Sequence, residues 1–153
     1  QEVLKFQENE RVALGIHVVM DAPSPVPLIW GDVGQLKQAF FNILKNAMES
    51  MRTGGYLKIG LCAQENWITL SFEDTGHGIT PEDLPKVLEP YFSRKPGGHG
   101  LGLMIVQRIL SQHGGTLGLH SQPGHGTRLT LKFPHPNAPV PLLAESTQDA
   151  AEP

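Results

Sequence analysis

Apolar residues recur at helical spacing in three stretches of the chain. A helix is predicted over residues 33–51, where one face carries Leu36, Phe40, Ile43, Leu44, Ala47 and Met51. Asp32 offers its N-cap, with Gln35 three residues later in the capping-box position. A second helix is predicted from about Gly100 to the glycine pair at 114–115, and a shorter one over residues 1–14.

Alternation of apolar and polar residues predicts five strands. The first covers residues 16–20, and a pair around residues 57–61 and 68–72 is joined by a turn at 64–66. Two further strands centre on residues 117–119 and 129–133. Between the two pairs, Thr80 and Pro81 predict the start of a short helix. This order of elements predicts an α/β sandwich of one sheet and one helical layer.

Composition narrows the class of protein. The chain of 153 residues is 39% hydrophobic and 18% charged, which is typical of a soluble globular domain. Its net charge of -3 and the lack of a basic stripe argue against nucleic-acid binding. The single cysteine, Cys62, excludes an internal disulfide. No apolar run approaches the roughly 20 residues of a membrane helix, so direct membrane insertion is not expected.

The helix over residues 33–51 carries two asparagines that face away from its apolar stripe. Asn42 and Asn46 are four residues apart and therefore share one face. Amide oxygens are hard ligands that suit Mg²⁺ already held by phosphate oxygens and water. An ordinary solvated helix face is the alternative interpretation of the same pair.

The segment DTGHGI begins at the end of a predicted strand. Asp74 could accept a hydrogen bond from an exocyclic amine such as adenine N6, and Gly76 and Gly78 would let a ring approach the backbone. A plain turn is the alternative, since Asp and Gly are common turn residues.

The segment GGHGLGL runs directly into a predicted helix. The free amides and positive dipole of such a junction favour an anion. It is neither a Walker A loop nor a dinucleotide fingerprint, because the Lys-Ser/Thr pair and the preceding strand are missing. The irregular residues 89–98 before it are predicted to form a mobile lid over phosphates.

The tripeptide Gly-His-Gly occurs three times, which raises the alternative of a metal site. A zinc site would need close-set ligands and usually a carboxylate or cysteine partner, whereas His77, His99 and His125 fall in three separate segments. We therefore favour a functional role for the glycines rather than for the histidines.

Five segments in this order resemble the ATP-binding domain of sensor histidine kinases. That superfamily also includes type II topoisomerases, ninety-kilodalton chaperones and mismatch-repair ATPases. The resemblance covers residues 15–133 and rests on the N, G1, F, G2 and G3 boxes of the family, which match QLKQAFFNILKNAMES, DTGHGI, LEPYFSRK, GHGLGL and GHGT. It implies a two-layer sandwich with a mixed, mostly antiparallel sheet covered on one face by helices, and ATP under a mobile lid.

The resemblance implies a role for each matching position. Asn46 would bind Mg²⁺ with support from Asn42, and Lys45 and Lys95 would be the catalytic cations near the phosphates. Asp74 would accept from adenine N6, through a water shared with Thr127. The other nucleotide-binding positions would be Gly76, Gly78, Ile79, Val87, Gly98, Gly100, Leu101, Gly102 and Leu103.

The resemblance also implies an activity and partners. The domain would transfer the γ-phosphoryl group of ATP to a histidine on a separate dimerisation domain, and would act on a response regulator indirectly. An anti-sigma-type serine kinase and a non-catalytic nucleotide sensor remain alternatives. Residues 1–14 would end an upstream hairpin or linker, and residues 134–153 would form a flexible tail. The location would be cytoplasmic, whether or not the parent kinase is membrane-anchored.

Two features depart from the family pattern. Many of these kinases carry Lys and Tyr three and four residues after the second asparagine, where this chain has Glu49 and Ser50. A basic residue, Lys45, instead precedes that asparagine, as in the nitrogen-regulator branch. None of the seven histidines stands in the phosphoacceptor context of a helical His followed by an acidic residue.

Overall fold

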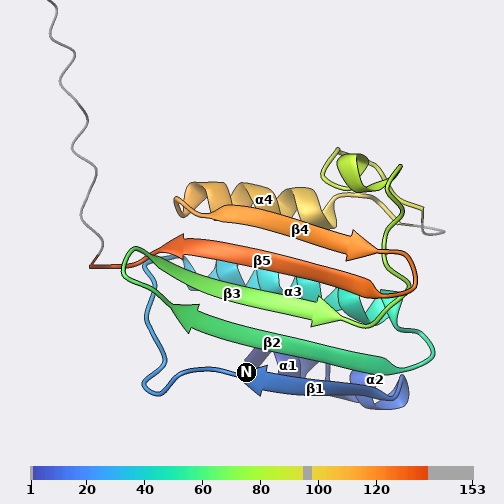
Figure 1. Ribbon diagram of the computed structural model, residues 1–153, viewed down its shortest axis with the longest axis horizontal. Helices are drawn as coiled ribbons and strands as arrows, with labels where there is room; N and C mark the ends of the chain where they lie inside the picture. Colours follow the sequence, from blue (N-terminus) through green and yellow to red (C-terminus); the bar gives the residue numbers. More distant parts are fainter. Residues whose placement is uncertain (1, 95–97, 138–153) are drawn as a thin grey trace, which may run out of the picture.

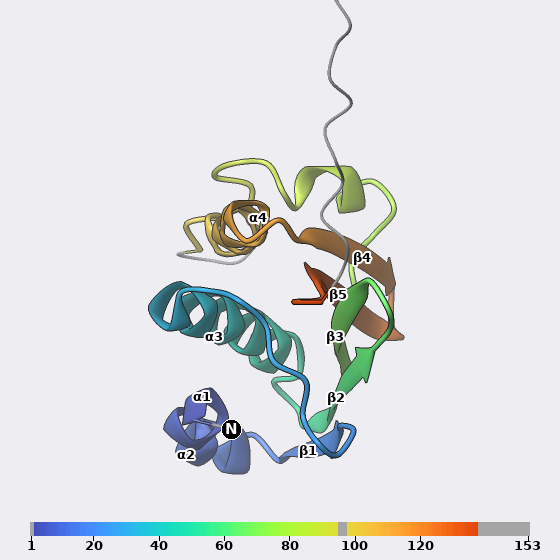
Figure 2. The ribbon, with the colours of Figure 1, turned by 90° about the vertical axis from the view of Figure 1, so that its left-hand side faces the viewer.

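The computed structural model describes residues 2–94 and 98–137 and shows a five-stranded sheet with helices on one face (Figures 1 and 2). The strand order is β1-β2-β3-β5-β4. Strands β1 and β2 are parallel, and the other neighbours are antiparallel. The predicted two-layer sandwich with a mixed, mostly antiparallel sheet is therefore confirmed. The strands are β1 (Ile16–Asp21), β2 (Gly55–Ala63), β3 (Trp67–Asp74), β4 (Thr116–Gln122) and β5 (Gly126–Pro134).

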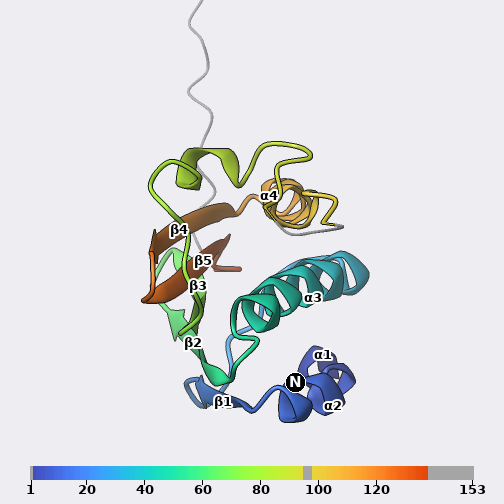
Figure 3. The same ribbon diagram turned by 90° about the vertical axis from the view of Figure 1, so that its right-hand side faces the viewer.

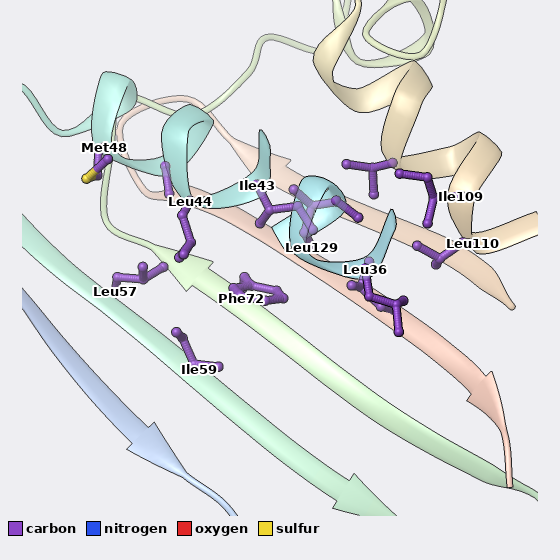
Figure 4. Close-up of a cluster of buried hydrophobic side chains, with 14 of the residues drawn as sticks. Leu36, Ile43, Leu44, Met48, Leu57, Ile59, Phe72, Ile109, Leu110 and Leu129 are labelled. Carbon is purple, nitrogen blue, oxygen red and sulfur yellow. The ribbon is translucent and has the colours of Figure 1, made fainter. Parts of the chain in front are cut away.

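The helical layer consists of α3 and α4, with two short N-terminal helices beside α3 (Figure 3). The helices are α1 (Glu2–Phe6), α2 (Glu8–Ala13), α3 (Val33–Ser50) and α4 (Gly102–Gln112), and a 3₁₀ helix, η1, spans Leu84–Lys86. Apolar side chains of α3 and α4 meet those of β2, β3 and β5 in one core (Figure 4). Val106 and Leu131 are completely buried there.

The end of α4 is tied to the start of α3. The Asp32 carboxylate caps α3 by accepting from the Gln35 amide at 2.8 Å, as predicted. The Asp32 amide does not complete a capping box with Gln35; it donates to Nε2 of His113 at 3.0 Å. Nδ1 of His113 lies 2.7 Å from the Ile109 carbonyl oxygen. Both contacts are satisfied by a neutral imidazole with its proton on Nδ1.

Helix α4 ends as the glycine pair predicts. Gly114 adopts a φ of 66°, and its amide donates to Ser111 while that of Gly115 donates to Leu110. This is a Schellman motif, which satisfies carbonyls that the helix leaves open. The turn at residues 64–66 is also confirmed, because the Gln64 amide donates to the Trp67 carbonyl oxygen at 2.8 Å.

Three element boundaries differ from the predicted ones. Residues 1–14 form two helices rather than one, because α1 packs on α3 whereas α2 packs on β1, and the chain bends at the buried Gln7. No α-helix begins at Pro81, because Pro85 has no amide hydrogen to donate to the Pro81 carbonyl oxygen. A turn that begins at Thr80 leads into η1 instead. Helix α4 begins at Gly102, because Gly100 has a φ of 63°.

Within the described residues, none of the helices is both long enough and apolar enough to span a bilayer.

We predict that His113→Ala lowers the free energy of unfolding by about 1 kcal/mol, because the Asp32 amide loses its acceptor. Urea denaturation followed by circular dichroism measures the change. His120→Ala, which removes an exposed imidazole from β4, is the matched control and should change stability less. Equal stability of the wild type and His113→Ala would show that the contact contributes nothing.

Candidate functional site

The two asparagines of α3 face the start of α4. A Cβ atom added at Gly102 would lie 3.6 Å from both Oδ1 of Asn42 and Nδ2 of Asn46. Nδ2 of Asn42 donates to the Gln38 carbonyl oxygen at 3.1 Å, so this amide is bound back to its own helix. Side chains from α3 and the first residue of α4 thus converge, although 56 positions of sequence separate Asn46 from Gly102.

The start of α4 also contacts the F-box segment. A Cβ atom at Gly100 would lie 2.5 Å from the Phe92 carbonyl oxygen, so only glycine fits against this backbone. No side chain caps the helix at Leu101. The first amides of a helix have no partner within it and favour an anion. The G2 box therefore places a helix start without a side-chain cap beside the two asparagines.

Asp74 is a buried carboxylate at the end of β3, with only 7% of the residue exposed. Its Oδ1 accepts from the Gly76 amide at 2.9 Å and lies 3.1 Å from Oγ of Ser50 on α3. Burial raises the pKa of Asp74, while the hydrogen bonds from Gly76, Ser50 and the Thr127 backbone and the charge of His77 act in the opposite direction. The net effect is a carboxylate that is costly to ionise in the folded state.

The G1 loop after Asp74 is hydrogen-bonded to the β4–β5 hairpin. The Gly124 amide donates to the His77 carbonyl oxygen at 2.8 Å, and the Ile79 amide donates to Oγ of Ser121 at the same distance. A side chain at Gly78 would overlap the Gln122 carbonyl oxygen, and its φ is 70°. The loop conformation therefore depends on glycine at this position.

Thr127 joins this cluster from β5. It is the cross-strand partner of Asp74, and its Oγ1 lies 2.9 Å from Oγ of Ser121. The Ser121 hydroxyl also contacts the Gly126 carbonyl oxygen at 2.9 Å. Ser121 therefore connects the G1 loop with the G3 turn, although no sequence motif includes it. Its position opposite Thr127 in the β4–β5 hairpin is the signal that could have found it.

The sequence-predicted residues thus fall into two groups along α3. Asn42, Asn46, Gly100 and Gly102 form one group, and Asp74, Gly76, Gly78, Ile79 and Thr127 form the other. Leu101 and Leu103 are half-buried beside the first group, and Leu103 packs against the core. Val87 is half-buried after η1, whereas Gly98 and Lys45 are exposed. Lys95 lies outside the described residues, as does part of the predicted lid over residues 89–98.

An ion pair that no sequence pattern predicted connects η1 to the F box. Arg94 donates from Nε and a terminal nitrogen to the two oxygens of Asp83, at 2.9 and 2.7 Å. The guanidinium holds the pKa of Asp83 below its usual value, and the carboxylate raises the pKa of Arg94. Residues 83 and 94 are thereby held together at the two ends of this segment.

The histidines of the G1 and G3 boxes contact their own loops. Nδ1 of His77 lies 2.7 Å from the Gly78 carbonyl oxygen, and Nδ1 of His125 lies 3.1 Å from that of Pro123. Across residues 2–94 and 98–137, no three His, Cys, Asp or Glu side chains gather as a metal site would require.

We predict that Asp74→Asn stabilises the nucleotide-free domain at neutral pH. The raised pKa of Asp74 means that its contribution to stability is full below about pH 4 and is lost as pH rises through the raised value. The variant, which avoids the buried charge, should melt at a higher temperature at pH 7, and the difference should shrink toward pH 4. Thermal unfolding against pH measures this. Asp21→Asn, at an exposed position in β1, is the control; a lower melting temperature for Asp74→Asn at pH 7 would contradict the argument.

Comparison with known proteins identifies the family. Residues 31–137 match the family of histidine kinase-, DNA gyrase B- and HSP90-like ATPases. Sporulation kinase A of Bacillus subtilis (strain 168) is 35% identical over 133 residues, which cover 87% of this chain and 22% of that protein. The chain therefore spans about a fifth of the length of this relative.

Solved structures agree with the family match. The nucleotide-free catalytic domain of histidine kinase ThkA superposes with a TM-score of 0.79 at 25% identity, over 88% of this chain and 90% of that domain. Full-length ShkA in complex with AMPPNP gives a TM-score of 0.78 at 28% identity, over 92% of this chain and 30% of ShkA. These relatives favour the histidine kinase interpretation over a serine kinase or a nucleotide sensor. With its match covering well over half of its length, the chain belongs to the family of histidine kinase-, DNA gyrase B- and HSP90-like ATPases.

Proposed function

We propose that the chain is the ATP-binding catalytic domain of a two-component sensor histidine kinase. It transfers the γ-phosphoryl group of ATP to a histidine on the dimerisation domain of the same kinase, and thereby acts on a response regulator. The observation that carries this proposal is the convergence of Asn42 and Asn46 on Gly102, at the start of α4. The names of the relatives support it.

The phosphate end of the site fits a magnesium–triphosphate group. Asn46 would hold Mg²⁺ through its amide oxygen, with Asn42 beside it. When bound, Mg²⁺ supplies positive charge next to the phosphate oxygens. The amides of Gly100 and Gly102 and the dipole of α4 would bind the phosphates, with Gly98 just before them. Lys45 and Lys95 are the proposed cations near the transferred group.

The base end fits adenine. The buried Asp74 carboxylate would accept from the exocyclic amine, and Thr127 would share a water with it. The glycines at 76 and 78 would contribute through the G1 loop, which packs closely against Ser50 and the β4–β5 turn at this end of the site. Ile79 and Val87, together with the half-buried leucines at 101 and 103, would form the apolar walls.

The chain's own residues position the reactants rather than activate a nucleophile. Asn42 is a neutral amide and cannot accept a proton as a general base, whereas the ATP hydrolases that resemble this domain use a glutamate there. Catalysis by this chain therefore consists of orientation and electrostatic stabilisation. The attacking imidazole comes from the partner domain. We assign residues 15–133 to the catalytic domain, in a cytoplasmic location.

We predict that Asn46→Ala and Asp74→Asn affect binding at opposite ends of the nucleotide. Asn46→Ala should weaken Mg-ATP but leave adenosine binding unchanged, because Asn46 reaches the nucleotide only through the metal and phosphates. Asp74→Asn should weaken both ligands by about 1–3 kcal/mol, because an amide nitrogen meets the adenine amine. Calorimetry measures both. Equal loss of adenosine and Mg-ATP in Asn46→Ala would contradict the assignment of Asn46.

We predict that the isolated chain neither phosphorylates itself nor hydrolyses ATP appreciably, but phosphorylates the dimerisation domain of its parent kinase in trans. Radiolabelled γ-phosphate from ATP measures the transfer. Asn46→Ala should abolish it, whereas Asn66→Ala, in the exposed β2–β3 turn, should retain it. Label on a histidine of the isolated chain, or no transfer to the partner domain, would overturn the proposed function.

A further inference from the structure

The hydroxyl of Ser50 lies where α3 meets the base end of the site. Ser50 follows Asn46 by four residues and Asn42 by eight, so the three side chains share one face of the helix. It is also a position at which the sequence departs from the family pattern of a tyrosine, and the resemblance assigns it no role.

Two donors converge on one oxygen of Asp74. Oδ1 accepts from the Gly76 amide at 2.9 Å and lies 3.1 Å from Oγ of Ser50. The approach is close enough that a Cβ atom at Gly76 would overlap the Ser50 hydroxyl. A loop amide on one side and a helix hydroxyl on the other therefore fix the rotation of the carboxylate about its Cβ–Cγ bond.

The Ser50 hydroxyl has one proton and two acceptors. Its oxygen lies 2.7 Å from the Ala47 carbonyl oxygen and 3.1 Å from Oδ1 of Asp74. An ionised carboxylate is the stronger acceptor of the two, because charge-assisted hydrogen bonds are roughly twice as strong as neutral ones. The proton is therefore directed to Asp74 when its carboxylate is charged.

We propose that Ser50 is a positioning residue for adenine recognition: its hydroxyl, with the Gly76 amide, holds Oδ1 of Asp74 so that Oδ2 is presented to the exocyclic amine of the base. The inference rests on the proposed function, in which Asp74 recognises adenine. Ser50 thereby contributes to the preference for adenine without touching the nucleotide. A smaller side chain at position 50 would remove one of the hydrogen bonds that restrain the rotation of the carboxylate.

The experiment compares two nucleotides that differ only at the amine. Calorimetry would give the affinities of ADP and of purine riboside 5′-diphosphate, which has hydrogen in place of the amine, for the wild type, Ser50→Ala, Ser50→Thr and Ser71→Ala. Ser50→Ala should weaken ADP about tenfold and the analogue hardly at all. Ser50→Thr, which keeps a hydroxyl, should restore the preference for ADP. Ser71→Ala, which removes a hydroxyl 3.4 Å from the Gly60 carbonyl oxygen in the sheet, should keep it.

Each outcome separates this inference from the proposed function. A wild type that does not bind ADP would overturn the proposed function itself. A wild type that prefers ADP, with the same preference in Ser50→Ala, would overturn only the role of Ser50. Equal weakening of both nucleotides would show that Ser50 is structural and would also overturn it. If Ser50→Ala does not fold, Ser50→Cys, which keeps the volume but donates weakly, makes the same comparison.

Discussion

The site depends on a single helix that is apolar on one face and polar on the next. The period of α3 buries Ile43 and Ala47 in the core, while Asn42, Asn46 and Ser50 lie on the adjacent face, toward Gly102 and Asp74. Burial of the apolar residues against the sheet therefore fixes the direction in which the three polar side chains point. Four residues of helix rise about 6 Å, so the spacing of the three polar side chains along the site follows from backbone geometry.

The site contains a buried carboxylate, Asp74, whose ionisation costs free energy of folding. Asp74 is buried beside the Gly76 amide and the Ser50 hydroxyl, and its ionisation is opposed by burial. The same burial strengthens any hydrogen bond that the carboxylate makes to a ligand, because water does not compete for it. Stability of the empty domain and the proposed recognition of a base therefore place opposite demands on this residue.

Local patterns predicted most of the architecture. The helical period and the N-cap at Asp32 placed α3, and the glycine pair placed the end of α4, because each signal lies within a few residues of its effect. The split between α1 and α2 was missed, since it arises from packing on two different partners. The contact of Ser121 with the G1 loop and the Arg94–Asp83 ion pair were missed because they depend on how separate segments pack, and only the β4–β5 hairpin register could have drawn attention to Ser121. The roles of the nucleotide-binding residues stay predictions, although the structure does bring Asn42, Asn46 and Gly102 together.

The contact between His113 and Asp32 helps to fix how α4 lies relative to α3. It joins the end of α4 to the start of α3, at the opposite end of α4 from Gly102. Helix α4 has 11 residues and is therefore about 16 Å long, which is the distance along the helix between this contact and its first residue. Val106, Ile109 and Leu110 are buried between these two ends, so the middle of α4 is held on the core. The position of the α4 start beside the asparagines is therefore set jointly by this buried face and by the His113 contact at the far end of the helix.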